Sequence, residues 1–419
     1  MDKKKNIMLT TSKDKNIWFF NLLLLGVILF KNADVYQDYV FGKSLIIRGI
    51  GILGLMLFWY SYFKLPKISL GQLCRNPLLV MFIFIGFVTI LRFDSNSDFT
   101  LYRKMMMGSY IWPYLMPLLL LVKMETKYIK FCLYWILAQM FLDLFFLAFN
   151  FQTIVYSSTI VLKLGRFDAF IINRFSVAAN LIVAIAAFGL ALSKFKNKWQ
   201  VLIIGTIILS LVSSMMGGRR SSSLLMILCL FIILCSYLKS KRKIILLVLL
   251  ALLISFSNWN VVDSLADQFN VMSERLAVNT RDGTETEFYN DMEWYDWIFG
   301  KGMDGTYKSL SVSLDDKLNR NLIETGYLNL ILHGGLLLLI PYLFFLIKAL
   351  YLGVSKSKNI FIKSFAFYIG LHLVYLYPGG TPALDLRYTL LFLLINFCIT
   401  HYRISSSEDF DISKKILKN

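Results

Sequence analysis

The sequence predicts an all-α integral membrane protein that crosses the bilayer about twelve times and carries one large external loop. Hydrophobic residues make up 57% of the 419-residue chain and charged residues only 17%, against about 25% charged residues in a typical soluble protein. The apolar residues fall in blocks of about 15–22 residues, close to the length with which a helix crosses the hydrocarbon core.

The apolar blocks and their connections define the expected organisation. Residues 1–257 hold the first nine spans, 258–321 the external loop, 322–400 the last three spans and 401–419 a cytoplasmic tail. The charged N-terminal segment lacks a small-residue cleavage site, so we expect it to be retained. The predicted spans are 17–31, 45–63, 77–91, 108–122, 129–149, 175–193, 199–217, 222–238, 243–257, 323–347, 360–378 and 386–400.

The positions of the cations predict the topology. If the N-terminus is cytoplasmic, every cytoplasmic connection carries at least three cations, as the positive-inside rule requires. Both termini are then cytoplasmic. The net charge of +18 is explained by topology, so we expect no nucleic-acid partner.

In this predicted topology, lysines and arginines are distributed differently between the two sides of the membrane. The cytoplasmic side holds 23 of the 30 lysines but three of the 14 arginines. A guanidinium binds phosphate oxygens in a two-pronged geometry that an ammonium cannot form, which favours a diphosphate ligand outside. Alternatively, these arginines anchor helix ends at the lipid headgroups. The eleven are Arg48, Arg92, Arg103, Arg166, Arg174, Arg219, Arg220, Arg275, Arg281, Arg320 and Arg387.

The external loop contains two distinct patterns. Val262, Leu265, Phe269, Met272 and Leu276 share one stripe of a predicted amphipathic helix. The following segment interleaves aromatic residues with carboxylates, which suits sugar rings; the alternative is that these aromatics form the core of the loop or lie at the membrane interface. The stretch GKGMDG at 300–305 has no strand–helix unit around it, so we interpret it as a glycine turn rather than a dinucleotide site.

Three segments resemble the bacterial O-antigen polymerase and O-antigen ligase superfamily of membrane glycosyltransferases. They are GRFDAFIINRFSVAANLI at 165–182, SSMMGGRRSSSLLM at 213–226, and the stretch from ERLAVNTRDG through WIFGKGMDGTY to LIETGYLNLILHGGLLLLIPYLFFL. The resemblance covers roughly residues 160–350. It implies a GT-C-like helical enzyme in the bacterial cytoplasmic (inner) membrane. Such an enzyme transfers a glycan from undecaprenyl diphosphate at the outer face, without a metal or other cofactor.

The resemblance also implies site residues and partners. Arg219 or Arg220, Arg281, and Arg166 or Arg174 match the family's external arginines and would bind the diphosphate, with Arg281 also catalytic. Separately from the resemblance, we expect Trp294 and Trp297 of the aromatic and acidic segment to bind the glycan together with Tyr327. The ligase branch has a histidine where this chain reads Glu324-Thr325-Gly326-Tyr327-Leu328, which favours a repeat-unit polymerase over a ligase. The implied partners are the lipid-linked oligosaccharide, membrane lipid, a chain-length regulator and a flippase.

The remaining polar residues leave several hypotheses open. Glu324 is either the base that activates the acceptor hydroxyl or a carboxylate facing a helix dipole. His333 is expected to be packed rather than catalytic. Asp143 is a functional candidate or a partner of Arg48. Arg387 would close the site or pair with Asp385. A polysaccharide or lipid transporter (flippase) is the alternative class, although no repeat relates the two halves of the chain.

Overall fold

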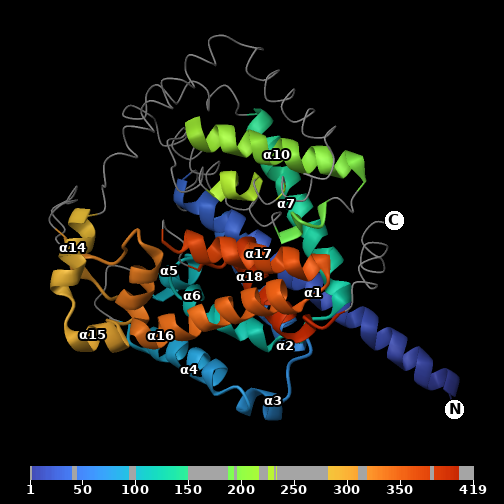
Figure 1. The fold of residues 1–419 in the computed structure, drawn as a ribbon, viewed down its shortest axis with the longest axis horizontal. Helices are drawn as coiled ribbons and strands as arrows, with labels where there is room; N and C mark the ends of the chain where they lie inside the picture. The colour runs from blue at the N-terminus through green and yellow to red at the C-terminus, as the bar shows by residue number, and fades with distance from the viewer. Residues whose placement is uncertain are drawn as a thin grey trace, which may run out of the picture.

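The computed structural model is mostly helical (Figure 1) and describes residues 2–39, 45–93, 101–149, 187–192, 196–216, 225–230, 233, 282–309, 319–377 and 382–404. Within these residues, three segments are long and apolar enough to cross a membrane: Lys15–Asp34, Leu45–Lys64 and Gly326–Lys356. Four shorter apolar segments accompany them, Pro77–Leu91, Trp112–Leu121, Ile360–Tyr375 and Leu386–His401. The prediction of an all-α membrane protein is therefore supported at this coarse level.

Eight helices coincide with predicted spans. They are α1 (Asp2–Tyr39), α2 (Leu45–Lys64), α4 (Pro77–Leu91), α7 (Ile129–Phe149), α10 (Asn197–Met216), α16 (Gly326–Tyr351), α17 (Ile360–Tyr375) and α18 (Leu386–His401). The other elements are α3 (Leu70–Cys74), α5 (Leu101–Met106), α6 (Trp112–Leu115), η1 (Met116–Leu121), η2 (Thr126–Tyr128), α14 (Asp282–Asp291), α15 (Trp294–Phe299), η5 (Leu352–Lys356) and the paired strands β1 (Tyr307–Lys308) and β2 (Asn319–Arg320). The predicted spans 175–193, 222–238 and 243–257 lie wholly or largely outside the described residues, as does the predicted amphipathic helix around 262–276.

The segment predicted as one span over 108–122 differs from that prediction. It consists of bends, the short helix α6 and the 3₁₀ helix η1. Pro113 and Pro117 each occupy one of the first two positions of these helices. Because proline has no backbone N–H and its ring clashes with the preceding turn, Pro117 prevents a continuous α-helix here.

Connections between the helices lie at two ends of the bundle. At one, which we call the basic end, Ile68 N donates to Leu121 O at 2.9 Å and Lys123 N donates to Pro66 O at 2.8 Å. His401 Nε2 lies 2.9 Å from Met124 O, which it can only donate to. These contacts join connections that the predicted topology assigns to one side of the membrane. The cations in or beside them are Lys64, Lys67, Arg75, Lys123, Lys127, Lys130 and Arg403.

The opposite end, which we call the loop end, joins the α4–α6 connection to the described part of the external loop and to the α17–α18 connection. Lys104 Nζ and Asp304 Oδ2 form a buried ion pair at 2.5 Å. Asn321 Nδ2 donates to the Tyr110 hydroxyl at 2.8 Å. Leu384 N donates to Gly108 O, also at 2.8 Å.

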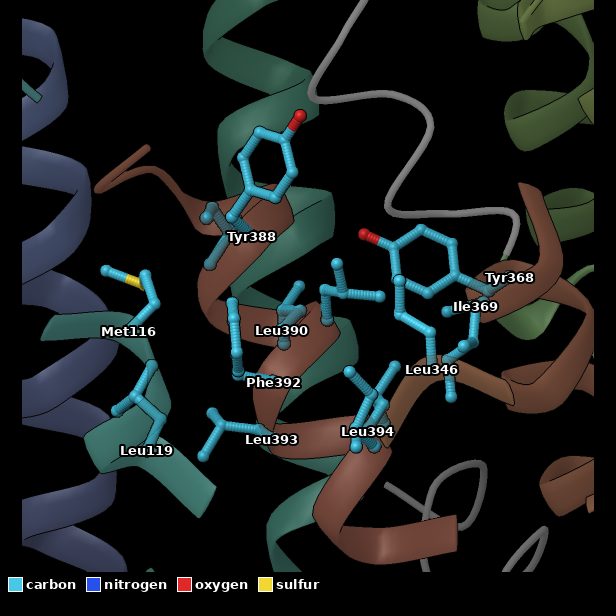
Figure 2. Packing of buried hydrophobic residues seen from close by; sticks show 14 of the residues in the cluster. Met116, Leu119, Leu346, Tyr368, Ile369, Tyr388, Leu390, Phe392, Leu393 and Leu394 are labelled. Atoms are coloured by element: carbon cyan, nitrogen blue, oxygen red, sulfur yellow. The ribbon is translucent and has the colours of Figure 1, made fainter. Parts of the chain in front are cut away.

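Helix α18 is the centre of the bundle. Every residue from Leu386 to Cys398 is buried, which is typical of a helix surrounded on all sides. Figure 2 shows Met116 and Leu119 of η1 on one side of α18, and Leu346 of α16 with Ile369 of α17 on the other. The first turn of α18 is at the loop end, so this rigid helix fixes Arg387 and Tyr388 there.

Helices α1 and α2 form a closely packed hairpin. A Cβ atom on Gly26 would lie 2.6 Å from Gly54 O, and one on Gly54 would lie 2.6 Å from Phe30 N. Only glycine permits this backbone approach, which is a common way to pack helices in membranes.

Helix α16 is interrupted at Gly335, which has φ 67° and ψ −170°. The glycine turn predicted at 300–305 packs into this interruption. Lys301 N donates to Leu332 O at 2.6 Å, and Gly302 N donates to His333 O at 2.9 Å. The loop therefore supplies donors to carbonyls near the break, where a buried polar group without a partner would be costly.

We predict that Gly335→Ala lowers the thermal unfolding midpoint of the purified protein. Alanine is strained at this positive φ by about 1–3 kcal/mol, and its Cβ would lie 2.1 Å from Ile298 O. Gly205→Ala in α10 is the matched control, because no atom surrounds its Cβ position within 4 Å and alanine favours a helix. Equal midpoints for the two variants would contradict the packing described here.

Candidate functional site

All five arginines predicted to bind the diphosphate lie outside the described residues: Arg166, Arg174, Arg219, Arg220 and Arg281. The structure does describe the side chains of four other arginines from the predicted external set: Arg48, Arg92, Arg320 and Arg387. Two of these, Arg92 and Arg387, lie at the loop end, and the groups that surround them are different.

Arg92 has a structural role. It follows the last residue of α4, and its Nη1 and Nη2 donate to Phe299 O and Gly300 O, each at 2.8 Å. These carbonyls end helix α15, so the guanidinium satisfies acceptors that a helix C-terminus leaves open. Arg92 thereby joins the turn after α15 to the end of α4.

Arg387 lies in the first turn of α18 and is only 5% exposed. Its Cζ lies 4.3 Å from the ring centroid of Tyr388 and 5.2 Å from that of Tyr375. Within the described residues, its Nε and Nη1 have no hydrogen-bond partner and it forms no ion pair. Buried donors are normally satisfied, so an unsatisfied buried guanidinium calls for a ligand or ordered water.

Other polar groups without partners surround Arg387. Among the described residues, His372 Nε2 and the hydroxyls of Tyr388 and Tyr342 are buried and unbonded. The His372 ring packs edge-on against Tyr368 at 4.7 Å and at a tilt against Tyr388 at 5.3 Å, ring centroid to ring centroid. In Figure 2 the Tyr388 hydroxyl points away from the leucine layer. We call Arg387, His372, Tyr375, Tyr388 and Tyr342 the arginine cluster.

Asp385 lies close to Arg387 but is bonded elsewhere. It is the N-cap of α18, and its Oδ1 accepts from Tyr388 N at 2.8 Å. Its carboxylate attracts the Arg387 guanidinium electrostatically, although the described side chains of the two residues form no direct ion pair. A cation in the first turn also opposes the helix dipole, whereas an anion there is favoured. The arginine cluster is therefore suited to an anionic group.

An aromatic row crosses the loop end. Trp297 of α15 stacks on Tyr289 of α14 at 5.9 Å, and Tyr327 of α16 stacks on Tyr377 at 6.3 Å. The side chains of Tyr289 and Tyr327 are close enough to interact electrostatically, which brings the two stacks together. Tyr377 follows the end of α17 two residues after Tyr375, so the row ends beside the arginine cluster.

Of the three aromatic residues predicted to bind the glycan, two belong to the aromatic row and one does not. Trp297 and Tyr327 belong to the aromatic row, while Trp294 is 71% exposed and packs edge-on against Tyr295. Trp297 also contacts Phe288, which packs against Tyr307. The alternative hypothesis of a small loop core is therefore confirmed for Phe288 and Tyr307.

Two carboxylates lie at the start of α16. Thr325 Oγ1 donates to Glu285 Oε1 in a short hydrogen bond, and Glu285 is close enough to influence Tyr327. Glu324 is exposed and lies near Tyr307, whose pKa is raised by burial first, then by Glu287 and Glu324, against the opposing charge of Arg320. Tyr289 belongs to the aromatic and acidic segment predicted to suit sugar rings, whereas Glu285 and Tyr377 were not singled out from the sequence. Glu285 stands in the stretch TETEFY of that segment.

The buried histidine His333 is packed, as expected. It is buried, and its Nδ1 lies 3.0 Å from Gly302 O. The side chain of Asp143, and with it the expected contact to Arg48, lies outside the described part of the chain.

No protein-family model, curated protein or solved structure matches this chain. The fold and the site by themselves define a helical membrane protein with a buried cationic cluster beside an aromatic row. Any closer assignment depends on the chemistry that this arrangement supports.

We predict that Arg92→Ala loosens the external loop from α4. It removes two charge-assisted hydrogen bonds to carbonyls, worth about 1.5–3 kcal/mol each. A protease added to the reconstituted protein should cut residues 291–305 faster than in the parent. Arg75→Ala, at an exposed position of the basic end, should leave the rate unchanged. Equal cleavage in all three proteins would show that Arg92 does not hold the loop.

Proposed function

We propose that this chain is a polysaccharide repeat-unit polymerase of the cytoplasmic membrane. It transfers a growing glycan from undecaprenyl diphosphate to the next lipid-linked repeat unit, at the outer face, with both termini cytoplasmic. In this proposal the loop end faces outward and the basic end faces the cytoplasm. The family resemblance of residues 160–350 motivates the proposal, and the arginine cluster supplies its chemistry.

The observation that carries the proposal is the buried Arg387 with its unbonded Nε and Nη1. A diphosphate presents oxygens at the spacing that a planar guanidinium binds with two hydrogen bonds. The start of α18 adds its dipole to that attraction. Arg166, Arg174, Arg219, Arg220 and Arg281 remain proposed ligands of the same diphosphate.

The proposed reaction breaks the bond between the anomeric carbon and the phosphate oxygen. Negative charge then develops on the leaving diphosphate, and Arg387 stabilises it from a position that burial has already fixed. The oxygen of an acceptor hydroxyl forms the new bond to the anomeric carbon. Its proton passes to a carboxylate, for which we propose Glu324 because it is exposed at the start of α16.

The aromatic row is proposed to hold the acceptor glycan. Sugar rings have apolar C–H faces that stack on aromatic rings, while their hydroxyls donate to carboxylates. Tyr289 and Tyr377 are 44% and 54% exposed, so both rings are accessible. Glu285 is a carboxylate close enough to Tyr327 to act on it electrostatically.

A transporter is the second candidate, favoured by the interruption of α16 at Gly335, since discontinuous helices are common in transporters. In those proteins the freed backbone groups bind the transported ion or substrate. Here Lys301 N and Gly302 N already occupy Leu332 O and His333 O. The interruption therefore accommodates the loop, which weakens the argument for transport.

The test uses the full chain in liposomes with a synthetic undecaprenyl-diphosphate repeat unit. We expect a ladder of longer products without ATP. Arg387→Lys and Arg387→Gln should reduce the elongation rate about 100-fold or more, as removal of a preorganised charge stabiliser does elsewhere. Arg403→Gln, at an exposed position of the basic end, should elongate normally.

Three outcomes would contradict the polymerase. Transfer of the lipid-linked unit across the bilayer without elongation would indicate a flippase. Attachment of the glycan to a lipid A–core acceptor without elongation would indicate an O-antigen ligase. Normal elongation by both Arg387 variants would show that the arginine cluster takes no part in the reaction.

We further predict that Tyr377→Ala raises the KM for the acceptor about 3–10-fold, with a smaller change in kcat. This range corresponds to the loss of one aromatic stacking contact of about 0.5–1.5 kcal/mol. Trp294→Ala should leave both constants unchanged, because Trp294 is outside the aromatic row. A raised KM for Trp294→Ala with an unchanged KM for Tyr377→Ala would instead place the glycan site on the outer face of α15.

A further inference from the structure

Helices α4 and α16 each expose one regular apolar stripe. On α4 the exposed large side chains recur at intervals of three and four residues, as do those on α16. The residues are Val80, Phe84, Phe87 and Leu91 on α4, and Leu336, Ile340, Phe344, Ile347 and Tyr351 on α16. Such a stripe follows one face of a helix, and a membrane helix presents this face to the lipid chains.

The two stripes belong to neighbouring helices. Helix α16 packs against α4, and Figure 1 shows the two side by side. Phe82 and Phe345, which lie on the inner sides of the two helices, stack with ring centroids 6.1 Å apart. We call the exposed surface formed by these two stripes the lipid wall.

Helix α15 is fixed at the end of this wall. Arg92 binds its last carbonyls from α4, and the turn that follows it hydrogen-bonds to Leu332 and His333 of α16. A Cβ atom on Gly335 of α16 would lie 2.1 Å from Ile298 O, so α15 and α16 are in backbone contact. The helix cannot move relative to the wall without breaking these contacts.

The outer surface of α15 is apolar and aromatic. Trp294, Tyr295, Ile298 and Phe299 are 71%, 50%, 36% and 53% exposed. Trp294 and Ile298 are four residues apart, as are Tyr295 and Phe299, so the four side chains share adjacent faces of the helix. The acidic Asp296 is buried on the other side, where Lys301 is 3.8 Å away.

We propose that this outer face of α15 is a lipid-binding surface that inserts into the boundary between phospholipid headgroups and acyl chains. Three features favour lipid over a protein partner or a sugar. The face continues the lipid wall, beginning where Leu91, 75% exposed, ends α4. It combines tryptophan and tyrosine with aliphatic and phenylalanine side chains, the composition of membrane interfaces. It is also separate from the aromatic row, which is the part of the loop end proposed for glycan.

This surface would set the depth of the loop end. The contacts that hold α15 to α4 and α16 would transmit its position to the start of α16, where Tyr327 and Glu324 lie. Only the separation from the aromatic row rests on the proposed function; the other two features use exposure, packing and composition alone.

The test measures membrane depth by spin labelling in phospholipid nanodiscs. Of the five cysteines, Cys74 is exposed and Cys132, Cys229 and Cys398 are buried, while Cys235 lies outside the described residues. The parent therefore carries Cys74→Ser and Cys235→Ser, and its residual labelling is subtracted. Trp294→Cys and Tyr295→Cys are labelled separately with a nitroxide. Thr286→Cys, at an exposed polar position of α14 in the same loop, is the matched control.

Collision rates with oxygen, which concentrates in lipid, are compared with those of a water-soluble nickel chelate. We expect the oxygen-to-nickel ratio at positions 294 and 295 to be several-fold higher than at 286. A ratio at both positions equal to that at 286 would overturn the proposal. If one labelled variant elutes as aggregate, the other position decides the result alone.

Discussion

The structure depends on one constraint: backbone groups placed at membrane depth must find partners within the protein. The interruption of α16 at Gly335 frees carbonyls, and the glycine turn after α15 supplies N–H groups to two of them. Positive φ values at Gly300 and Gly302 allow this close approach, because a Cβ on either would lie 2.4 Å from the opposing backbone. The external loop is therefore part of the membrane fold and not an addition to it.

The same constraint explains why two external arginines have different surroundings. Arg92 finds carbonyl acceptors at the end of α15, and its charge is satisfied by the fold. Arg387 is enclosed by aromatic rings, and no described acceptor reaches its Nε or Nη1. The arginines predicted to be external are therefore not one group. Arg92 stabilises the fold, whereas Arg387 retains buried donors without a described partner.

Long apolar blocks made the helices predictable, and α2, α4, α17 and α18 begin close to their predicted residues. The stretch HGGLLLL reads as one continuous span because hydropathy does not register the φ of Gly335. Likewise, the 108–122 block is apolar enough for a span, but Pro117 ends the regular helix. Of the site, Trp297 and Tyr327 were predicted, and Tyr289 stands in the same aromatic and acidic segment as Trp297. Glu285 and Tyr377 were not singled out, because only the packing of α14 and α17 around the start of α16 brings them together with the others.

The glycine contacts between α1 and α2 have a consequence for biogenesis. With Gly26 and Gly54 so closely opposed, the two segments have matching surfaces from the moment both have been synthesised. They are consecutive in the chain, so their association needs no later segment. If α1 and α2 pair before they leave the insertion machinery, Gly26 and Gly54 are already covered at that stage. The remaining helices would then pack against a preformed hairpin.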